Sequence, residues 1–406
     1  MRLYDTARRA VVPFQPRDNR VGMYVCGITP YDAAHMGHAF AYHVFDVIAR
    51  RLILLDVDVH HVRNITDVDD DILRVARERN ADYRTVGDAQ VQRFDRDMAD
   101  IGLLPVDAAP RATMHVAEMV RWIARLHEEG YAYEQAGWVF FDTAKFPRYG
   151  RLSGLDVATM TALSRERGAD PDDPRKHNPL DFVLWQQSAA GEPSWPSPWS
   201  DGRPGWHIEC SVLSTGELGH PIDLHGGGDD LIYPHHDSEI AQAEAIGVAP
   251  YVTHWVHVAM VRHQGEKMSK SLRNLVFVRD VLERVPGPTV RILLAAHHYR
   301  ESWTYDEDEL READERRQRY HVAMQSDATL DSDDAQDYER QFLERLDDDL
   351  DTPGALRIID LAAAALTHGA VRSRGGPVKA EEVLGRLLDT IGARAARRSE
   401  SVGPAA

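Results

Sequence analysis

The chain has 406 residues, 43% of them hydrophobic and 28% charged, and a formal net charge of −18, so it is long enough for two or three domains and has no general attraction for a polyanion. No stretch approaches the ~18 consecutive apolar residues of a membrane span, and the first residues lack the apolar core of a secretory signal. Because only two cysteines occur, we expect no disulfide framework and a soluble protein of the reducing cytoplasm.

Strand and helix patterns alternate in the first third of the chain. Residues 21–25 and 57–65 are predicted as strands on either side of a helix at 39–55, which is a β-α-β unit of a parallel sheet. Further helical patterns occupy 91–98 and 115–127, and Gly130 provides a stop for the second.

The middle of the chain changes in composition. After a strand pair near 138–141, residues 145–205 are rich in Pro, Gly, Arg and Asp and are predicted as an irregular, ordered insertion. Strand patterns resume at 222–225 and 255–258. From Tyr305 onward the pattern is helical and charged, which predicts an appended bundle with helices at 308–319, 338–346 and 355–366.

These patterns predict an α/β fold in which a parallel-sheet, nucleotide-binding domain is split by an insertion and followed by a C-terminal α-helical bundle. The expected divisions are the first half of the nucleotide-binding domain at 1–110, a connective insertion at 111–205, the second half at 206–300, the bundle at 301–393 and a disordered tail at 394–406.

Two short signatures, far apart in the chain, point to ATP chemistry. The first, HMGH, contains His35 and His38, and the second, KMSKS, contains Lys267 and Lys270. Either alone is a weak signal, and the histidines could instead cap a core helix. Adenylate formation places negative charge on the α-phosphate and the departing pyrophosphate, so it needs imidazole and cationic donors. We predict that the two histidines supply these donors at a helix N-terminus and that the two lysines close over the phosphates.

A second constellation, consisting of Cys26, Cys210, His235 and Glu239, is a candidate metal site. Isolated cysteines are usually small buried hydrophobes, so spacing alone would not establish the site. Cys26 ends the first predicted strand, however, and His235 and Glu239 are spaced i, i+4 on one predicted helix from Pro234. If these segments meet at the carboxyl ends of one sheet, two thiolates, an imidazole and a carboxylate would suit Zn²⁺.

A glycine-rich segment follows the predicted strand at 222–225. Gly226, Gly227 and Gly228 precede Asp229 and Asp230, and glycines let the backbone approach a nucleotide closely. An ordinary tight turn from strand to helix is the alternative. The glycine-rich segment lies just before the helix that carries the proposed metal ligands, and this position favours a pocket shared by adenosine and metal.

Several motifs together resemble those of a known family, the class I cysteine-activating ligases, which comprise cysteinyl-tRNA synthetases and mycothiol cysteine ligases. The resemblance covers roughly residues 1–365, and the motifs are CGITPYD at 26–32, NITDVDD at 64–70, GWHIEC at 205–210, GGGDD at 226–230 with PHH at 234–236, and KMSKS at 267–271.

The resemblance implies a Rossmann-like class I aminoacyl-tRNA synthetase catalytic domain. It also implies one zinc ion, which takes the substrate thiolate as a ligand and so distinguishes cysteine from serine. Cys26, Cys210 and His235 would bind zinc, with Glu239 as a further ligand, and ATP would act with Mg²⁺. The implied substrate and adenylate pocket consists of Cys26, Gly27, Ile28, Thr29, Asn64, Ile65, Thr66, Trp206, Gly228, Asp229, Asp230 and Val261.

The acceptor of the activated cysteine is the point on which the two branches of the family differ. Residues 166–171 and 350–353, and Phe40 where tRNA enzymes commonly carry Arg, resemble the mycothiol branch, which couples cysteine to glucosaminyl-inositol. The chain also ends soon after the bundle. We therefore expect amide formation with this amino sugar in mycothiol biosynthesis.

Other features keep the alternatives open. Glu239 and the segments 181–185 and 208–211 resemble the tRNA enzymes, so charging of tRNA(Cys) is the alternative function. A catalytically inactive binding module is a third possibility, although such proteins generally lose the catalytic donors that are present here. No membrane or disulfide partner is expected.

Overall fold

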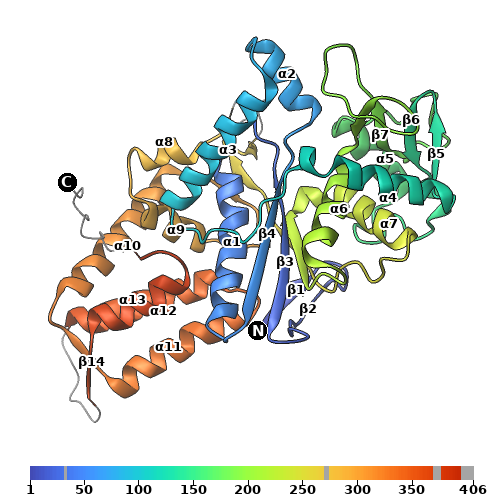
Figure 1. Ribbon diagram of the computed structural model, residues 1–406. Coiled ribbons are helices and arrows are strands. Elements are labelled where there is room, and N and C mark those ends of the chain that lie inside the picture. The colour runs from blue at the N-terminus through green and yellow to red at the C-terminus, as the bar shows by residue number, and fades with distance from the viewer. Residues whose placement is uncertain (32–33, 269–273, 369–375, 395–406) are drawn as a thin grey trace, which may run out of the picture.

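The computed structural model describes residues 1–31, 34–268, 274–368 and 376–394 (Figure 1). At its centre is a four-stranded sheet of order β10-β9-β3-β4, in which all neighbouring strands are parallel. Its strands are β3 (Arg20–Ile28), β4 (Asp58–Ile65), β9 (Leu224–Gly228) and β10 (Trp255–Val258). The first two precede the insertion and the last two follow it, which confirms the predicted split α/β fold.

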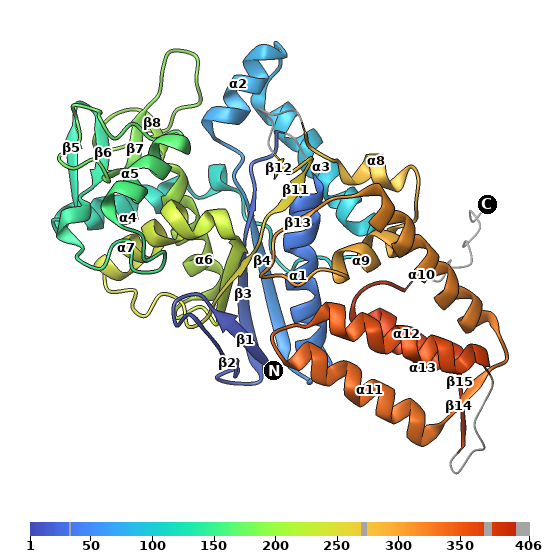
Figure 2. The same cartoon turned by 180° about the vertical axis from the view of Figure 1, so that it is seen from behind.

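Side chains of β3 alternate between two hydrophobic cores. Met23 and Val25 pack into the core around helix α1 (Met36–Ile53), whereas Tyr24 and Cys26 belong to the core that the insertion shares. This alternation follows from the period of two in a strand. One face of the sheet therefore packs on α1, and the other carries Cys26 towards helix α6 (Trp206–Leu218) (Figures 1 and 2).

Three helices connect the sheet to the insertion: α2 (Asp70–Glu78), α3 (Tyr83–Asp100) and α4 (Val116–Glu128). The carboxylates of Asp69 and Asp82 cap the first two by accepting backbone hydrogen bonds. Helix α4 ends just before Gly130, which has a positive φ of 79°, as the sequence predicted.

The insertion holds an antiparallel sheet of order β5-β6-β7-β8. Residues 145–205 consist largely of turns and irregular segments, as expected, but they also contain one helix and two strands of this sheet that the composition did not predict. The apolar run at 182–185 supplies Leu184 and Trp185 to the second core, and this burial stabilises a strand that the surrounding Pro and Gly content obscured. The elements are β5 (Ala132–Gln135), β6 (Trp138–Phe141), α5 (Val157–Glu166), β7 (Phe182–Gln187) and β8 (Gly202–Pro204).

Two predicted boundaries near the second half of the sheet differ in the structure. The strand expected at 222–225 is β9 at Leu224–Gly228 and includes the glycines, and a Cβ on Gly226 would lie 2.0 Å from the carbonyl oxygen of Val256 on β10, so only glycine fits there. The helix expected from Pro234 begins only at Asp237: residues 232–236 form a wide, π-type turn, and α7 spans Asp237–Ala245.

The C-terminal part is helical, as predicted, and packs against α1. Arg291 of α9 forms an ion pair with Asp46 of α1 and donates a hydrogen bond to the carbonyl of Ile391 (2.9 Å). The helices are α8 (Val278–Leu282), α9 (Gly287–Ala295), α10 (Glu307–Gln325), α11 (Ser332–Asp347), α12 (Thr352–His368) and α13 (Ala380–Thr390). Across the described residues, no helix combines the length and apolarity needed to cross a membrane.

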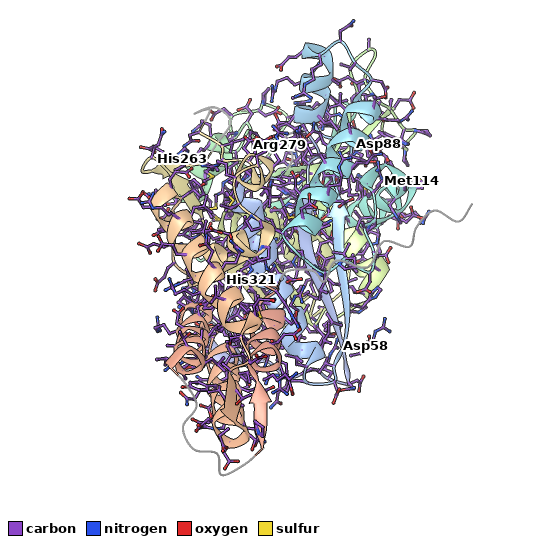
Figure 3. All side chains as sticks on the ribbon, turned by 90° about the vertical axis from the view of Figure 1, so that its left-hand side faces the viewer. Asp58, Asp88, Met114, His263, Arg279 and His321 are labelled. Carbon is purple, nitrogen blue, oxygen red and sulfur yellow. The ribbon has the colours of Figure 1, made fainter. Side chains whose placement is uncertain are left out.

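Short strands complete the fold: β1 (Arg2–Asp5), β2 (Ala10–Pro13), β11 (Val261–His263), β12 (Glu266–Lys267), β13 (Trp303–Thr304), β14 (Thr329–Asp331) and β15 (Pro377–Lys379). In Figure 3, Asp58 at the amino end of β4 lies well below Asp88 of α3 and Arg279 of α8. The carboxyl ends of the parallel strands therefore face the upper end of the molecule, where such sheets bind ligands.

Candidate active site and metal centre

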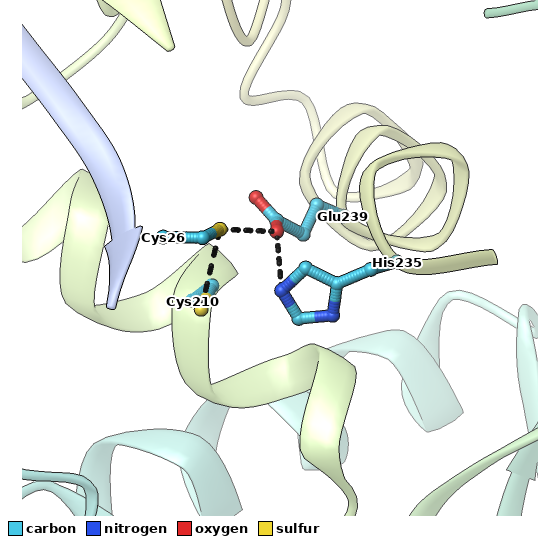
Figure 4. A group of neighbouring side chains, drawn as sticks. All are labelled: Cys26, Cys210, His235 and Glu239. Carbon is cyan, nitrogen blue, oxygen red and sulfur yellow. Dashed lines mark hydrogen bonds and ion pairs between the residues drawn. The ribbon is translucent and has the colours of Figure 1, made fainter. Parts of the chain in front are cut away.

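Four buried donors meet where β3, α6 and α7 come together (Figure 4). Cys26 Sγ lies 3.9 Å from Cys210 Sγ and 3.7 Å from Glu239 Oε1. The same carboxylate oxygen is 2.9 Å from His235 Nε2. All four ligand atoms lie within 4.8 Å of one another, and both cysteines are free thiols. The structure thus brings together the four residues that the sequence singled out.

Opposing charges control protonation in this cluster. Burial raises the pKa of the Cys210 thiol, but a hydrogen bond from Cys26 and the charge of His235 bring it down to about 6. Burial also disfavours the imidazolium, yet the charges of Glu239 and Cys210 raise the pKa of His235 to about 10. With Glu239 ionised, the cluster carries two negative charges and one positive charge, and this excess favours a divalent cation.

The donor set fits a tetrahedral zinc site. Two sulfurs, one ring nitrogen and one carboxylate oxygen are the ligand types that Zn²⁺ takes, and all four donors point into the same space. Alkaline-earth cations prefer oxygen ligands, so a site with two thiols disfavours Mg²⁺ and Ca²⁺.

A shell of hydrogen bonds holds the donors in place. Glu239 Oε2 contacts His225 Nε2 at 2.8 Å and accepts a hydrogen bond from the Tyr251 hydroxyl at 2.9 Å. On the other side, His236 Nε2 lies 3.3 Å from Cys26 Sγ, and His236 Nδ1 lies 2.7 Å from His257 Nε2. Such second contacts fix the orientation of metal ligands.

Sequence reasoning did not assign roles to these supporting residues. The signal was present in the strands: Cys26 on β3, His225 on β9 and His257 on β10 share the face opposite to Val256 and Val258. A period of two along each strand, applied across the aligned sheet, would have placed the histidines beside Cys26. Cys26, His225 and His236 form a second trio with metal-ligand spacing.

The first signature lies at the amino end of α1. His35 is the N-cap, and its Nδ1 accepts a hydrogen bond from the backbone N–H of Gly37 at 3.1 Å. The His35 and His38 rings stack with centroids 3.9 Å apart. Both imidazoles therefore sit at a helix N-terminus, where backbone N–H groups favour a phosphate.

The segment that follows the second signature runs beside the first. Met36 N donates to Val276 O (2.9 Å) and Val278 N donates to Ala34 O (2.9 Å), so the segment after KMSKS runs beside the start of α1. Lys267 ends β12, and Lys270 lies outside the described residues.

The predicted pocket residues after β3 and β4 form a connected network. Gly27 N donates to Asn64 Oδ1 at 2.7 Å, and Asn64 Nδ2 donates to Thr66 Oγ1 at 3.1 Å. A Cβ on Gly27 would lie 1.6 Å from the carbonyl oxygen of Asn64, which explains the glycine. Ile28 and Ile65 are buried partners across the two strands, and Thr29 follows directly.

Glu209, which sequence reasoning did not single out, contacts the same network from α6. A hydrogen bond joins its carboxyl group to Thr66. Burial, followed by the charges of Cys210 and Asp69, raises the pKa of Glu209 well above its ordinary range. The only sequence signal was a glutamate next to a proposed metal ligand.

The remaining predicted pocket residues lie around the cluster or beyond it. The Trp206 ring stacks on the His235 ring at a centroid distance of 4.4 Å and is 38% exposed, so it covers the cluster on its solvent side. Gly228 ends β9, and Asp229 and Asp230 form the short helical turn after it. Val261 begins β11 and is buried.

With this geometry in place, comparison with known proteins identifies the family. The family model described as the tRNA synthetases class I (C) catalytic domain matches residues 13–315. The chain belongs to this family. Its members are ligases, and the fold class expected from the sequence is confirmed.

Similar proteins also bear on the two branches. A cysteine–tRNA ligase of Chromohalobacter salexigens is 45% identical over 397 residues, covering 97% of this chain and 85% of that protein. Another, from Thioalkalivibrio sulfidiphilus, is 42% identical over 392 residues, covering 93% of this chain and 84% of that protein. The expected assignment to the mycothiol branch finds no support in these relatives, which carry the name of the alternative.

Solved structures show the same fold at low sequence identity. A Mycobacterium tuberculosis methionyl-tRNA synthetase with methionyl-adenylate matches 86% of this chain and 82% of that chain, with a TM-score of 0.62 and 17% identity. A leucyl-tRNA synthetase of Agrobacterium radiobacter matches 93% of this chain and 83% of that chain, with a TM-score of 0.60 and 11% identity.

Proposed function

We propose that this chain uses ATP to convert L-cysteine to cysteinyl-adenylate and then transfers the cysteinyl group to tRNA(Cys). The observation that carries the proposal is the buried cluster of Cys26, Cys210, His235 and Glu239 beside the signature histidines. The cysteine–tRNA ligases that resemble this chain over most of its length support the choice of acceptor.

Selection of cysteine follows from the chemistry of the cluster. Cys26, Cys210, His235 and Glu239 would hold zinc, a borderline-soft Lewis acid that would prefer a thiolate to a hydroxyl. The stacked Trp206 ring limits access of water to this pocket. A ligand preference of this kind separates cysteine from serine, which has nearly the same shape.

In the first step, a carboxylate oxygen of cysteine attacks the α-phosphorus of ATP, and pyrophosphate leaves. His35 and His38, at the amino end of α1, are placed to donate to phosphate oxygens as negative charge develops there. We assign Lys267 and Lys270 the same task from the KMSKS segment, and ATP would act with Mg²⁺.

In the second step, a terminal ribose hydroxyl of the tRNA attacks the cysteinyl carbonyl carbon, and AMP leaves. We assign Gly228, Asp229, Asp230 and Val261 to the adenosine moiety. Arg167 donates a hydrogen bond to the Asp230 carbonyl, so the 166–171 segment, which favoured the amino sugar, supports the adenosine segment.

Two assays test the proposal in sequence. Isotope exchange between pyrophosphate and ATP should depend on cysteine and should be at least 100-fold weaker with serine at equal concentration. Intact-mass measurement after adding either tRNA(Cys) or glucosaminyl-inositol then identifies the acceptor. Charged tRNA supports the proposal, a cysteinyl-sugar amide would place the chain in the mycothiol branch, and no exchange would indicate a binding module.

A further inference from the structure

One carboxyl oxygen beside the metal cluster lacks a partner. Glu209 is 1% exposed, and its Oε2 has no hydrogen-bond donor within the part of the chain that the structure describes. The side chain is held by the Thr66 hydroxyl. Buried carboxyl oxygens almost always accept a hydrogen bond, so the absence of one here indicates that a bound ligand provides the donor.

Neighbouring acidic side chains already have donors. Asp67 accepts hydrogen bonds from the Thr113 backbone N–H (2.9 Å) and hydroxyl (2.7 Å). Asp69 accepts one from Asp71 N (2.8 Å) as the cap of α2. These carboxylates make the surroundings of Glu209 negative, and Glu209 is the one of the three with a buried, unpaired oxygen.

The location ties Glu209 to the thiol-binding end of the pocket. It precedes Cys210 on α6, and it bonds to Thr66, which accepts from Asn64. Asn64 in turn holds the backbone of Gly27, the residue after Cys26. The network therefore runs from Glu209, the neighbour of Cys210 in the chain, to Gly27, the neighbour of Cys26.

We propose that Glu209 binds the ammonium group of the amino-acid substrate, with Thr66 holding its carboxylate in position. This rests on the proposed function, because a cysteine whose thiol lies at the cluster carries its ammonium only a short distance away. Carboxylate and ammonium form a charge-assisted hydrogen bond, which is strong in a buried site. A thiol without the ammonium would leave the Glu209 oxygen unpaired, so Glu209 makes the site selective for amino acids over simple thiols.

The test compares two ligands on the zinc-loaded enzyme by calorimetric titration in the absence of ATP. One is L-cysteine, and the other is 3-mercaptopropionate, which keeps the thiol and carboxylate but has no ammonium. Glu209→Gln should weaken cysteine binding about 10- to 100-fold and change 3-mercaptopropionate binding less than about threefold. Equal weakening of both ligands, or no change for cysteine, would overturn the proposal.

Controls separate this assignment from folding and from the proposed function. Glu217→Gln makes the same change at an exposed site on the same helix and should bind both ligands as the wild type does. If Glu209→Gln does not fold, Glu209→Asp provides the comparison, because the retained charge should preserve part of the preference for cysteine. A wild-type enzyme that holds zinc but does not bind cysteine would contradict the proposed function itself, whereas normal cysteine binding that Glu209→Gln leaves intact contradicts only the role of Glu209.

Discussion

The contact between Tyr251 and Glu239 offers a direct test of whether Glu239 belongs to the metal site. The Tyr251 hydroxyl is buried, donates to Glu239 Oε2 at 2.9 Å and lies 2.7 Å from Ser214 Oγ. Tyr251→Phe removes that hydroxyl with almost no change in side-chain volume. The carboxylate then keeps His225 and His235 as partners but loses a donor that sets its orientation.

The expected magnitude follows from the partners that the hydroxyl leaves behind. A hydrogen bond to a charged, buried group contributes about 1.5–3 kcal/mol, and loss of a second contact to a metal ligand lowers metal affinity about 10- to 100-fold. Competition with a zinc-binding dye should show a loss of this size in Tyr251→Phe. The unfolding temperature of the zinc-loaded variant should fall as well, because the lost affinity reduces stabilisation of the folded state.

Ser214→Ala is the matched control. It removes the other partner of the Tyr251 hydroxyl but leaves the bond to Glu239, so zinc affinity should change less than about threefold. If Tyr251→Phe binds zinc as tightly as the wild type, then Glu239 is not held for metal binding by this contact. The four-donor site would in that case reduce to Cys26, Cys210 and His235.

Three further outcomes are expected elsewhere in the molecule. Asp46→Asn should lower the free energy of unfolding by about 3–5 kcal/mol in urea titration, because Arg291, with no exposed surface, loses its charged partner. Burial alone would raise the pKa of Asp46, but the charge of Arg291 lowers it, so the stability from its ionisation is present above the unfolded pKa of about 4 and is lost as the pH falls through the lower folded value. Urea titrations between pH 5 and 2 should therefore show a smaller loss of stability in Asp46→Asn than in the wild type. Gly27→Ala should reduce soluble expression and unfolding temperature, since its Cβ would meet the Asn64 carbonyl, whereas a variant as stable as the wild type would contradict the close packing of β3 on β4. His38→Ala should lower kcat for pyrophosphate exchange far more than it changes cysteine binding by calorimetry, and equal losses in both would favour a structural role.

The residues that form the candidate metal site could be predicted from local sequence, but the residues that contact and orient them could not. Cys26, Cys210, His235 and Glu239 are of residue types that few other roles require together, and their flanking motifs are specific. Glu209, His225 and His257 carry no such mark, because a buried glutamate or histidine acquires meaning only from what lies opposite it. The preference for an amino-sugar acceptor rested on short segments and on Phe40, and one of these segments, at 166–171, contacts the Asp230 carbonyl through Arg167.

Some elements of the fold could likewise be predicted from the sequence, and others could not. The β3-α1-β4 unit and the bundle helices were predictable, because the hydrophobic pattern of each segment matches its secondary structure. The strand β7 and the glycine segment of β9 were not, because each is stabilised by a neighbour distant in the chain: the second core for β7, and the backbone of Val256 for Gly226.

By itself, the sequence determined which residues could do chemistry and on which kind of element each lies, since local period, caps and residue type are properties of short segments. Only the tertiary structure decided that Cys26 and Cys210 stand 3.9 Å apart, with Glu239 held between His225 and His235. The physical reason is that the parallel sheet is built from two halves of the chain on either side of the insertion, so the register of β9 against β3 sets distances that no local pattern encodes.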